Sequence, residues 1–148
     1  SQQKEMISEG NRRQSIIDKF SPELKQKMEK ALQASKELDE MLPHRYGQVA
    51  VFDEDSCIAI CGFWIGNKLW VGKYLELDNI VVREKYRSQG VGKLMFDFLE
   101  KKAQEQQCNM LSLDSYTNNF HAHKFFYNEG YAPRGFHFIK LLNKDAVR

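Results

Sequence analysis

The segment from Leu75 to Ala103 joins an apolar strand pattern, two closely spaced glycines and an amphipathic helix pattern, in that order. Gly90 and Gly92 fall at the start of the helix, where backbone N–H groups have no intrahelical partner. Apolar residues then recur at every third and fourth position: Val91, Leu94, Met95, Phe98 and Leu99. This stripe predicts a helix over 91–106 that packs on a sheet and leaves its first turn accessible.

The rest of the chain predicts helices first and strands afterwards. Ser21 and Pro22 are typical of a helix start and Pro43 of its end, so residues 1–44 are expected to be helical. A shorter helix is expected over 11–20, whereas residues 1–10 fit a strand or a helix. Strands are expected over 47–55, 56–66, 68–82, 108–116 and 133–142, with a short helix within 118–130. The order predicts a mixed α/β fold around one central, mostly antiparallel sheet flanked by helices.

Composition narrows the function classes. The chain has 148 residues, about one domain, and a net charge of +2, so any attraction for an anion must be local. Its basic residues form no stripe interleaved with aromatic residues, so no nucleic-acid surface is expected. The three cysteines form no CxxC pair, which favours a reducing cytoplasm. A polar, charged start and the absence of a long apolar run predict neither a signal peptide nor a membrane span.

Small residues at a helix start beside an arginine predict an anion site, and phosphate is the usual ligand of such sites. A P-loop is excluded because Lys93 is followed by Leu94 instead of serine or threonine. A dinucleotide fingerprint is excluded because its third glycine would fall on Met95. A lone G-x-G also fits a simple tight turn, so the surrounding sequence has to decide.

Two motifs in the surrounding sequence favour a phosphate site over a simple tight turn. Residues 87–92, Arg-Ser-Gln-Gly-Val-Gly, match the Q/R-x-x-G-x-G/A motif of the GCN5-related N-acetyltransferases. Residues 118–131, "NNFHAHKFFYNEGY", resemble that family's second conserved block, and "LDNIVVREKY" resembles its fourth strand. The resemblance covers residues 46–142 of what is expected to be a single acetyltransferase domain, with residues 1–44 as its helical part.

The resemblance implies an enzyme that transfers an acetyl group from acetyl-coenzyme A to a primary amine in a ternary complex. It also implies splayed fourth and fifth strands, with the pantetheine pairing along the fourth. The implied cofactor-binding residues are Ile80, Val81, Val82, Arg87, Ser88, Gln89, Gly90, Val91, Gly92 and Lys93, with Asn118 or Asn119 on the pantetheine arm. An N–H of Ile80 or a neighbour would hold the oxyanion.

Carboxylates inside a strand that should be apolar are the candidate catalytic bases. Glu76 and Asp78 are two residues apart in one expected strand, so their side chains should lie on the same face of the sheet. Glu76 occupies the position that family members with a strand-four glutamate use as base. Either carboxylate could instead bind the cationic amine, or both could be ordinary surface charges.

The second motif departs from the family at the general acid. Counting four residues back from Gly130 gives Phe126 where the family often has tyrosine. Tyr127 lies about 100° around the helix from it. We expect Phe126 to face the cofactor and water to protonate the thiolate, with Tyr127 as the alternative acid.

The sequence alone does not identify the amine that accepts the acetyl group. The short chain slightly favours a small-molecule amine over a peptide amine, and a homodimer is possible. No metal is expected, because His121 and His123 cannot share a helix face and lack a third ligand. The alternative from another class is a non-catalytic acyl-coenzyme A binding module, favoured by the missing tyrosine and opposed by Glu76.

Overall fold

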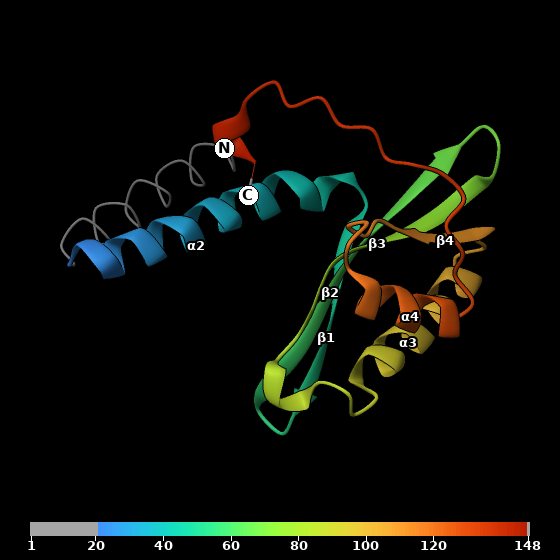
Figure 1. The fold of residues 1–148 in the computed structure, drawn as a ribbon, viewed down its shortest axis with the longest axis horizontal. Helices are drawn as coiled ribbons and strands as arrows, with labels where there is room; N and C mark the ends of the chain where they lie inside the picture. The colour runs from blue at the N-terminus through green and yellow to red at the C-terminus, as the bar shows by residue number, and fades with distance from the viewer. Residues whose placement is uncertain (1–20, 148) are drawn as a thin grey trace. The chain divides into compact units, whose positions relative to one another are not determined.

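A computed structural model of the protein describes residues 21–147. It contains α2 (Pro22–Met41), η1 (Leu42–His44), β1 (Tyr46–Asp53), β2 (Ser56–Lys68), β3 (Gly72–Val82), η2 (Glu84–Tyr86), α3 (Val91–Glu105), β4 (Met110–Leu113), α4 (Phe120–Asn128) and η3 (Lys144–Ala146) (Figure 1). Contacts divide the chain into two compact units, which meet between Tyr46 and Gly47. The prediction of a single domain therefore stays a prediction.

The first unit contains the helix predicted from residue 22 onward. Pro22 opens α2 and Glu23 lies in its first turn, where an acidic side chain suits the helix dipole. Pro43 lies in η1 directly after α2, as expected of a residue that cannot continue a helix. The predictions for residues 1–20 fall outside the described residues.

The second unit is built on one open sheet with strand order β1-β2-β3-β4 (Figure 1). Strand β3 pairs antiparallel with β2 along its length, but it pairs in parallel with β4 only over Tyr74–Leu77 against Met110–Leu113. The part of β3 from residue 78 to Val82 therefore has β2 on one side and no strand of residues 21–147 on the other. This is the opening that the resemblance implied between the family's fourth and fifth strands, which are β3 and β4 here.

A β-bulge lies just beyond the end of this parallel pairing. Ile60 pairs with Val81 and Gly62 pairs with Asp78. Between these two pairs β3 therefore has one more residue than β2. Asn79 takes up the extra residue with a left-handed φ of 53°, a conformation that asparagine tolerates better than most residues. The bulge turns the last residues of β3 relative to its paired half.

Helices α3 and α4 lie side by side on one face of the sheet (Figure 1). The core between sheet and helix comprises Ala59, Cys61, Phe63, Leu75, Leu77, Met95, Phe96, Leu99 and Ala103. Phe96 reaches from α3 to α4, and its ring centroid lies 5.0 Å from that of Phe125 and 6.1 Å from that of Phe126. The mixed α/β fold with one central sheet is thus confirmed.

The predicted stripe of α3 is partly wrong. Met95 and Leu99 are buried as expected, but Leu94 and Phe98 are 59% and 54% exposed. Phe96, which the stripe left out, is buried instead. The reason is that α3 has two neighbours, the sheet and α4, so its buried arc is rotated toward α4.

Two strand predictions need correction. The strand expected over 68–82 is interrupted, because β2 extends to Lys68 and a turn at residues 69–71 leads into β3. Gly72, with a left-handed φ of 74°, ends that turn. The final strand expected over 133–142 is wrong, since the chain there is extended but joins no sheet among the described residues.

The two leucines of α3 provide a matched stability test. Leu99→Ala should lower the free energy of unfolding by about 2–5 kcal/mol, because it removes a fully buried side chain and leaves a cavity. Leu94→Ala should change it by less than about 0.5 kcal/mol, because Leu94 is mostly exposed. Urea denaturation of both variants measures this. Equal losses would contradict the orientation of α3.

Candidate active site

The first turn of α3 is open to an external ligand. Gly90 is the N-cap residue with φ 83° and ψ 6°, and no side chain caps the helix. A Cβ on Gly90 would meet nothing within 4 Å, so space around it is free. The left-handed backbone favours glycine there, and the free space leaves the amides of the first turn accessible to an anion.

Gly92 lies against α4. A Cβ at this position would lie 3.4 Å from Cζ of Phe125, which is an ordinary van der Waals contact. Packing alone therefore leaves room for alanine, and a role of Gly92 in the anion site stays a prediction. Gly90 and Gly92, which the sequence treated alike, face different surroundings.

The loop before α3 is held by three side-chain hydrogen bonds, in addition to backbone hydrogen bonds. Arg87 donates from Nε to the carbonyl of Val82 (3.2 Å), and Gln89 donates from Nε2 to the carbonyl of Lys85 (2.9 Å). The hydroxyl of Tyr86 donates to Asp53 (2.8 Å), which ties the loop to the β1–β2 turn and raises the pKa of Tyr86. The loop thus has a defined shape without a bound ligand.

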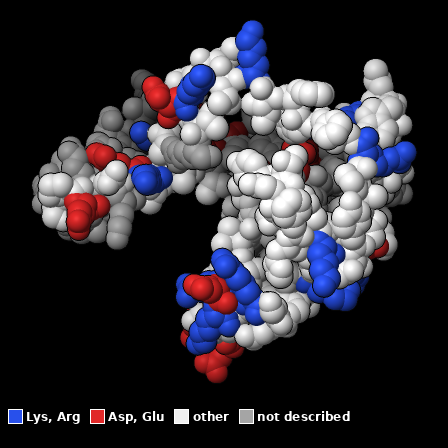
Figure 2. Space-filling view, in the orientation of Figure 1, with Lys and Arg blue, Asp and Glu red and all other residues white. Residues whose placement is uncertain are grey.

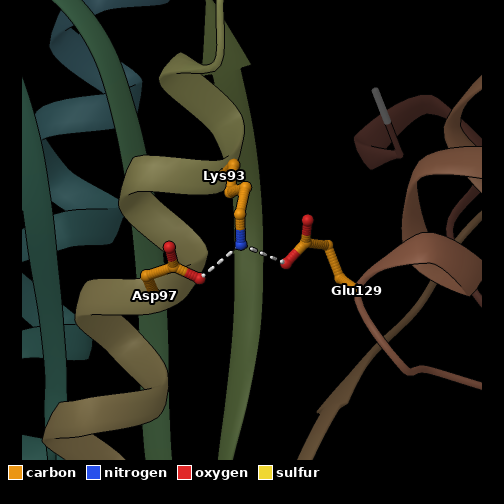
Figure 3. A network of polar contacts seen from close by, with 3 residues as sticks. All are labelled: Lys93, Asp97 and Glu129. Atoms are coloured by element: carbon orange, nitrogen blue, oxygen red, sulfur yellow. Dashed lines mark hydrogen bonds and ion pairs between the residues drawn. The ribbon is translucent and has the colours of Figure 1, made fainter.

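Lys93 in the first turn of α3 is shared between two carboxylates (Figure 3). Its Nζ lies 3.0 Å from Asp97 and 3.6 Å from Glu129, whose side chain is only 14% exposed. The hydrogen bond to Asp97 raises the pKa of Lys93, with a smaller contribution from Glu129. Lys93 therefore already binds two acidic groups and joins the start of α3 to the end of α4.

Charges around the loop are mixed. Figure 2 shows blue and red atoms interleaved over η2 and the neighbouring β1–β2 turn, where Arg83, Lys85 and Arg87 lie close in sequence to Glu84. No continuous basic surface forms on this face of the described residues. The charge pattern suits a compact anion bound by backbone amides.

The free edge of β3 presents backbone groups close to this loop. Arg83 donates its N–H to Ile58 in β2 (2.9 Å). Because hydrogen-bonding directions alternate along an antiparallel strand, the backbone groups of Ile80 and Val82 point to the opposite, open side. The carbonyl of Val82 accepts from Arg87 there, which agrees with this direction.

The two asparagines before α4 have different surroundings. Asn119 is the N-cap of α4, and its Oδ1 accepts from the N–H of Ala122 (3.4 Å). Asn118 is exposed, and no hydrogen bond to another residue of 21–147 engages its side chain. Capping restrains Asn119, so Asn118 is the better of the two for contact with a ligand.

Glu76 and Asp78 lie on the sheet face opposite α3. They alternate with Leu75 and Leu77, which are buried against the helix. Asp78 accepts a hydrogen bond from Nε1 of Trp64 (3.1 Å), an interaction that the sequence did not predict. No hydrogen bond or ion pair with another described residue engages the carboxylate of Glu76. The two carboxylates therefore share a face but differ in their partners.

Helix α4 has the predicted orientation. Phe125 and Phe126 pack on the core, whereas Tyr127 is 58% exposed. Phe126 packs against Phe96 and Tyr131, with ring centroids 6.1 and 6.5 Å apart. Burial raises the pKa of Tyr131 to about 12, so this phenol stays protonated at neutral pH. The sequence did not single out Glu129 and Tyr131, and only the apolar neighbours of Tyr131 hinted at its burial.

Residues 21–147 contain no cluster of three or more His, Cys, Asp or Glu side chains placed to hold a metal ion. Within the same residues, no helix has both the length and the apolar character needed to cross a bilayer.

Known proteins resemble this chain over most of its length. The model of the Acetyltransferase (GNAT) family matches residues 13–131. A putative [ribosomal protein bS18]-alanine N-acetyltransferase of Bacillus subtilis (strain 168) is 28% identical over 65% of this chain and 61% of its own length. The aminoalkylphosphonate N-acetyltransferase of Salmonella typhimurium is 28% identical over 54% of this chain and 50% of its own length. The chain thus matches only part of each relative.

A solved structure supports the fold. The aminoglycoside antibiotic 6'-N-acetyltransferase of Acinetobacter haemolyticus has a TM-score of 0.63 at 18% identity, covering 75% of this chain and 81% of that one. At this identity the likeness establishes the fold alone. The family match over 13–131, the open sheet and the uncapped start of α3 lead to one conclusion: the chain belongs to the GNAT acetyltransferase family.

Proposed function

We propose that the protein is an N-acetyltransferase that transfers the acetyl group of acetyl-coenzyme A to a primary amine by direct attack in a ternary complex. The observation that supports it most is the uncapped first turn of α3 beside the unpaired end of β3. An anion-binding helix start and a free strand edge suit the pyrophosphate and the amide-bearing pantetheine of one ligand.

The residues present fit this ligand. The amides of the loop and first turn, residues 87–93, would hold the pyrophosphate, and Arg87 would keep the loop against Val82. The backbone of Ile80–Val82 would pair with the pantetheine, and Asn118 would contact the pantetheine arm. When bound, acetyl-coenzyme A supplies the activated acyl group.

Glu76 is proposed as the general base. An amine with a pKa of about 10.4 is neutral in only roughly one molecule in two thousand at pH 7, so a proton acceptor is needed. The Glu76 carboxylate has no partner among the described residues, whereas one oxygen of Asp78 is occupied by Trp64. This difference favours Glu76 as the proton acceptor and Asp78 as a group that attracts the ammonium form of the substrate.

Water is proposed as the proton source for the departing thiolate. Tyr127 faces away from the core, and Phe126 occupies the position where many family members have tyrosine.

The class of acceptor amine stays open. The relatives are named for a ribosomal protein alanine, an aminoalkylphosphonate and an aminoglycoside, so their names do not favour one class of acceptor. A small-molecule amine stays slightly favoured over a peptide. Thiol release with a panel of lysine peptides, polyamines, aminoglycosides and aminoalkylphosphonates tests the proposal, and cofactor binding without turnover would favour the non-catalytic module.

Gly90→Asn tests whether acetyl-coenzyme A binding depends on the absence of a side chain at residue 90, because this substitution adds a side chain but keeps the left-handed backbone. Asparagine tolerates the left-handed backbone, so Gly90→Asn should keep the fold. Its side chain should raise the Kd for acetyl-coenzyme A roughly tenfold or more, because it competes with phosphate for the amides. Calorimetric titration measures this.

Gly130→Asn is the control for that experiment. Gly130 also has a left-handed φ, 89°, and free space around its Cβ, but it lies after α4. This variant should bind acetyl-coenzyme A within about twofold of wild type. Unchanged binding by Gly90→Asn would argue against a phosphate at this turn.

Glu76→Gln should lower turnover by a factor of about 10²–10⁴ at neutral pH, the usual contribution of a general base. The loss should shrink at high pH, where the acceptor amine deprotonates by itself. A pH–rate profile from pH 6 to 9 on wild type, Glu76→Gln and Asp78→Asn measures both effects. Normal turnover by Glu76→Gln across this range would transfer the role to Asp78.

Tyr127→Phe should change turnover by less than about fivefold, because it removes only an exposed hydroxyl. Phe126→Tyr, which restores the residue type frequent in the family, should leave turnover equal or faster and preserve binding. Steady-state rates of thiol release measure both. A hundredfold loss in Tyr127→Phe would identify Tyr127 as the acid.

A further inference from the structure

Ser112 in β4 has a buried hydroxyl that lies outside the residues assigned above to cofactor binding and catalysis. The Oγ atom of Ser112 is buried and has no hydrogen-bond partner, and it is the one such side-chain atom found among residues 21–147. Its strand neighbours, Met110, Leu111 and Leu113, are all apolar. An unpaired hydroxyl removed from water destabilises a fold, so this position carries a cost that alanine would avoid.

The sheet register places Ser112 beside the candidate base. Ser112 is the direct neighbour of Glu76 across the parallel β3–β4 pairing. Neighbouring residues of a sheet project to the same face, so both side chains lie opposite the core, while Leu111 and Leu113 pack on the core beside Leu75 and Leu77.

Ser112 also lies at the edge of the opening in the sheet. The β3–β4 pairing ends one step later, at Leu77 and Leu113. Beyond this step the two strands are no longer paired, and the proposed pantetheine edge of β3 begins. The side chain of Ser112 is thus next to the candidate base, one residue before the opening in the sheet.

We propose that Ser112 is a positioning residue whose hydroxyl holds a water molecule between the acceptor amine and Glu76. The inference rests on the proposed function. As the N–C bond forms, the π electrons of the thioester carbonyl move to its oxygen, and the water accepts a proton from the nitrogen and passes one of its own to the Glu76 carboxylate. The carbonyl then re-forms and the C–S bond breaks, so that coenzyme A leaves as a thiolate and takes its proton from solvent. Ser112 keeps its proton, because it only orients the water by hydrogen bonding.

Ser112→Ala tests this proposal because it should lower turnover without lowering the stability of the fold. The melting temperature of the ligand-free protein should stay equal or rise, since an unpaired buried hydroxyl is removed. Turnover at pH 7 should fall roughly tenfold, the upper range for one lost hydrogen bond. The loss should diminish toward pH 9, as the acceptor loses its proton without help.

Two companion variants sharpen the result. Ser112→Thr keeps the hydroxyl and suits a strand, so it should restore most of the turnover. Ser115→Ala removes an exposed hydroxyl from the loop after β4 and should leave turnover and its pH profile unchanged. Acetyl-coenzyme A should bind the alanine and threonine variants at position 112 as tightly as wild type.

Other outcomes overturn the inference. A lower melting temperature with normal turnover in Ser112→Ala would show that Ser112 is structural. An equal loss at every pH would exclude the water relay. A wild-type protein that binds acetyl-coenzyme A but acetylates no amine would refute the proposed function itself, whereas active wild type with fully active Ser112→Ala would refute this inference alone.

Discussion

Strand β3 has hydrogen-bonding neighbours on both edges over only its first half, and the candidate site depends on this. Up to Leu77 it is fixed between β2 and β4. The bulge at Asn79 follows, and beyond it β2 is the one neighbour of β3 among the described strands. Unpaired backbone donors and acceptors on an edge strand bind another extended chain readily. An amide-bearing ligand arm can therefore occupy an edge that the fold itself leaves open.

The second requirement is a fixed position of α3 relative to that edge. The helix packs on β2 and β3 through Met95, Leu99 and Ala103, and Phe96 anchors it against α4. Phe125 lies against Gly92, and Lys93 joins the same turn to Glu129. The helix start is thus held from two sides while Gly90 stays open to solvent. Packing on the sheet and on α4 thus fixes the position of the first turn of α3.

The sequence predicted the parts of the fold that follow from local pattern. The strand–glycine–helix segment, the helix from Pro22 and the short helix within 118–130 are all confirmed. The two motifs led to the correct family, since each depends on residue types at fixed spacing.

Errors arose where tertiary neighbours decide the structure. Leu94 and Leu99 have the same periodicity, and only the position of α4 separates the exposed residue from the buried one. The alternating segment 133–142 has a strand pattern but pairs with no described strand. The contacts of Trp64 with Asp78 and of Lys93 with Glu129 join residues 14 or more apart, which no local pattern reveals. Glu76, Gly90 and Arg87 were identified from sequence, but their roles in binding and catalysis remain predictions.

Hydrogen–deuterium exchange with and without acetyl-coenzyme A tests the central claim directly. If the ligand occupies the opening beside β3 and the first turn of α3, amides in two separate segments, residues 79–82 and 87–94, should exchange more slowly when it is present. Amides of β2 that are already paired, such as those opposite Leu75 and Leu77, should change little. Protection absent from both segments, or confined to another part of the chain, would contradict the account.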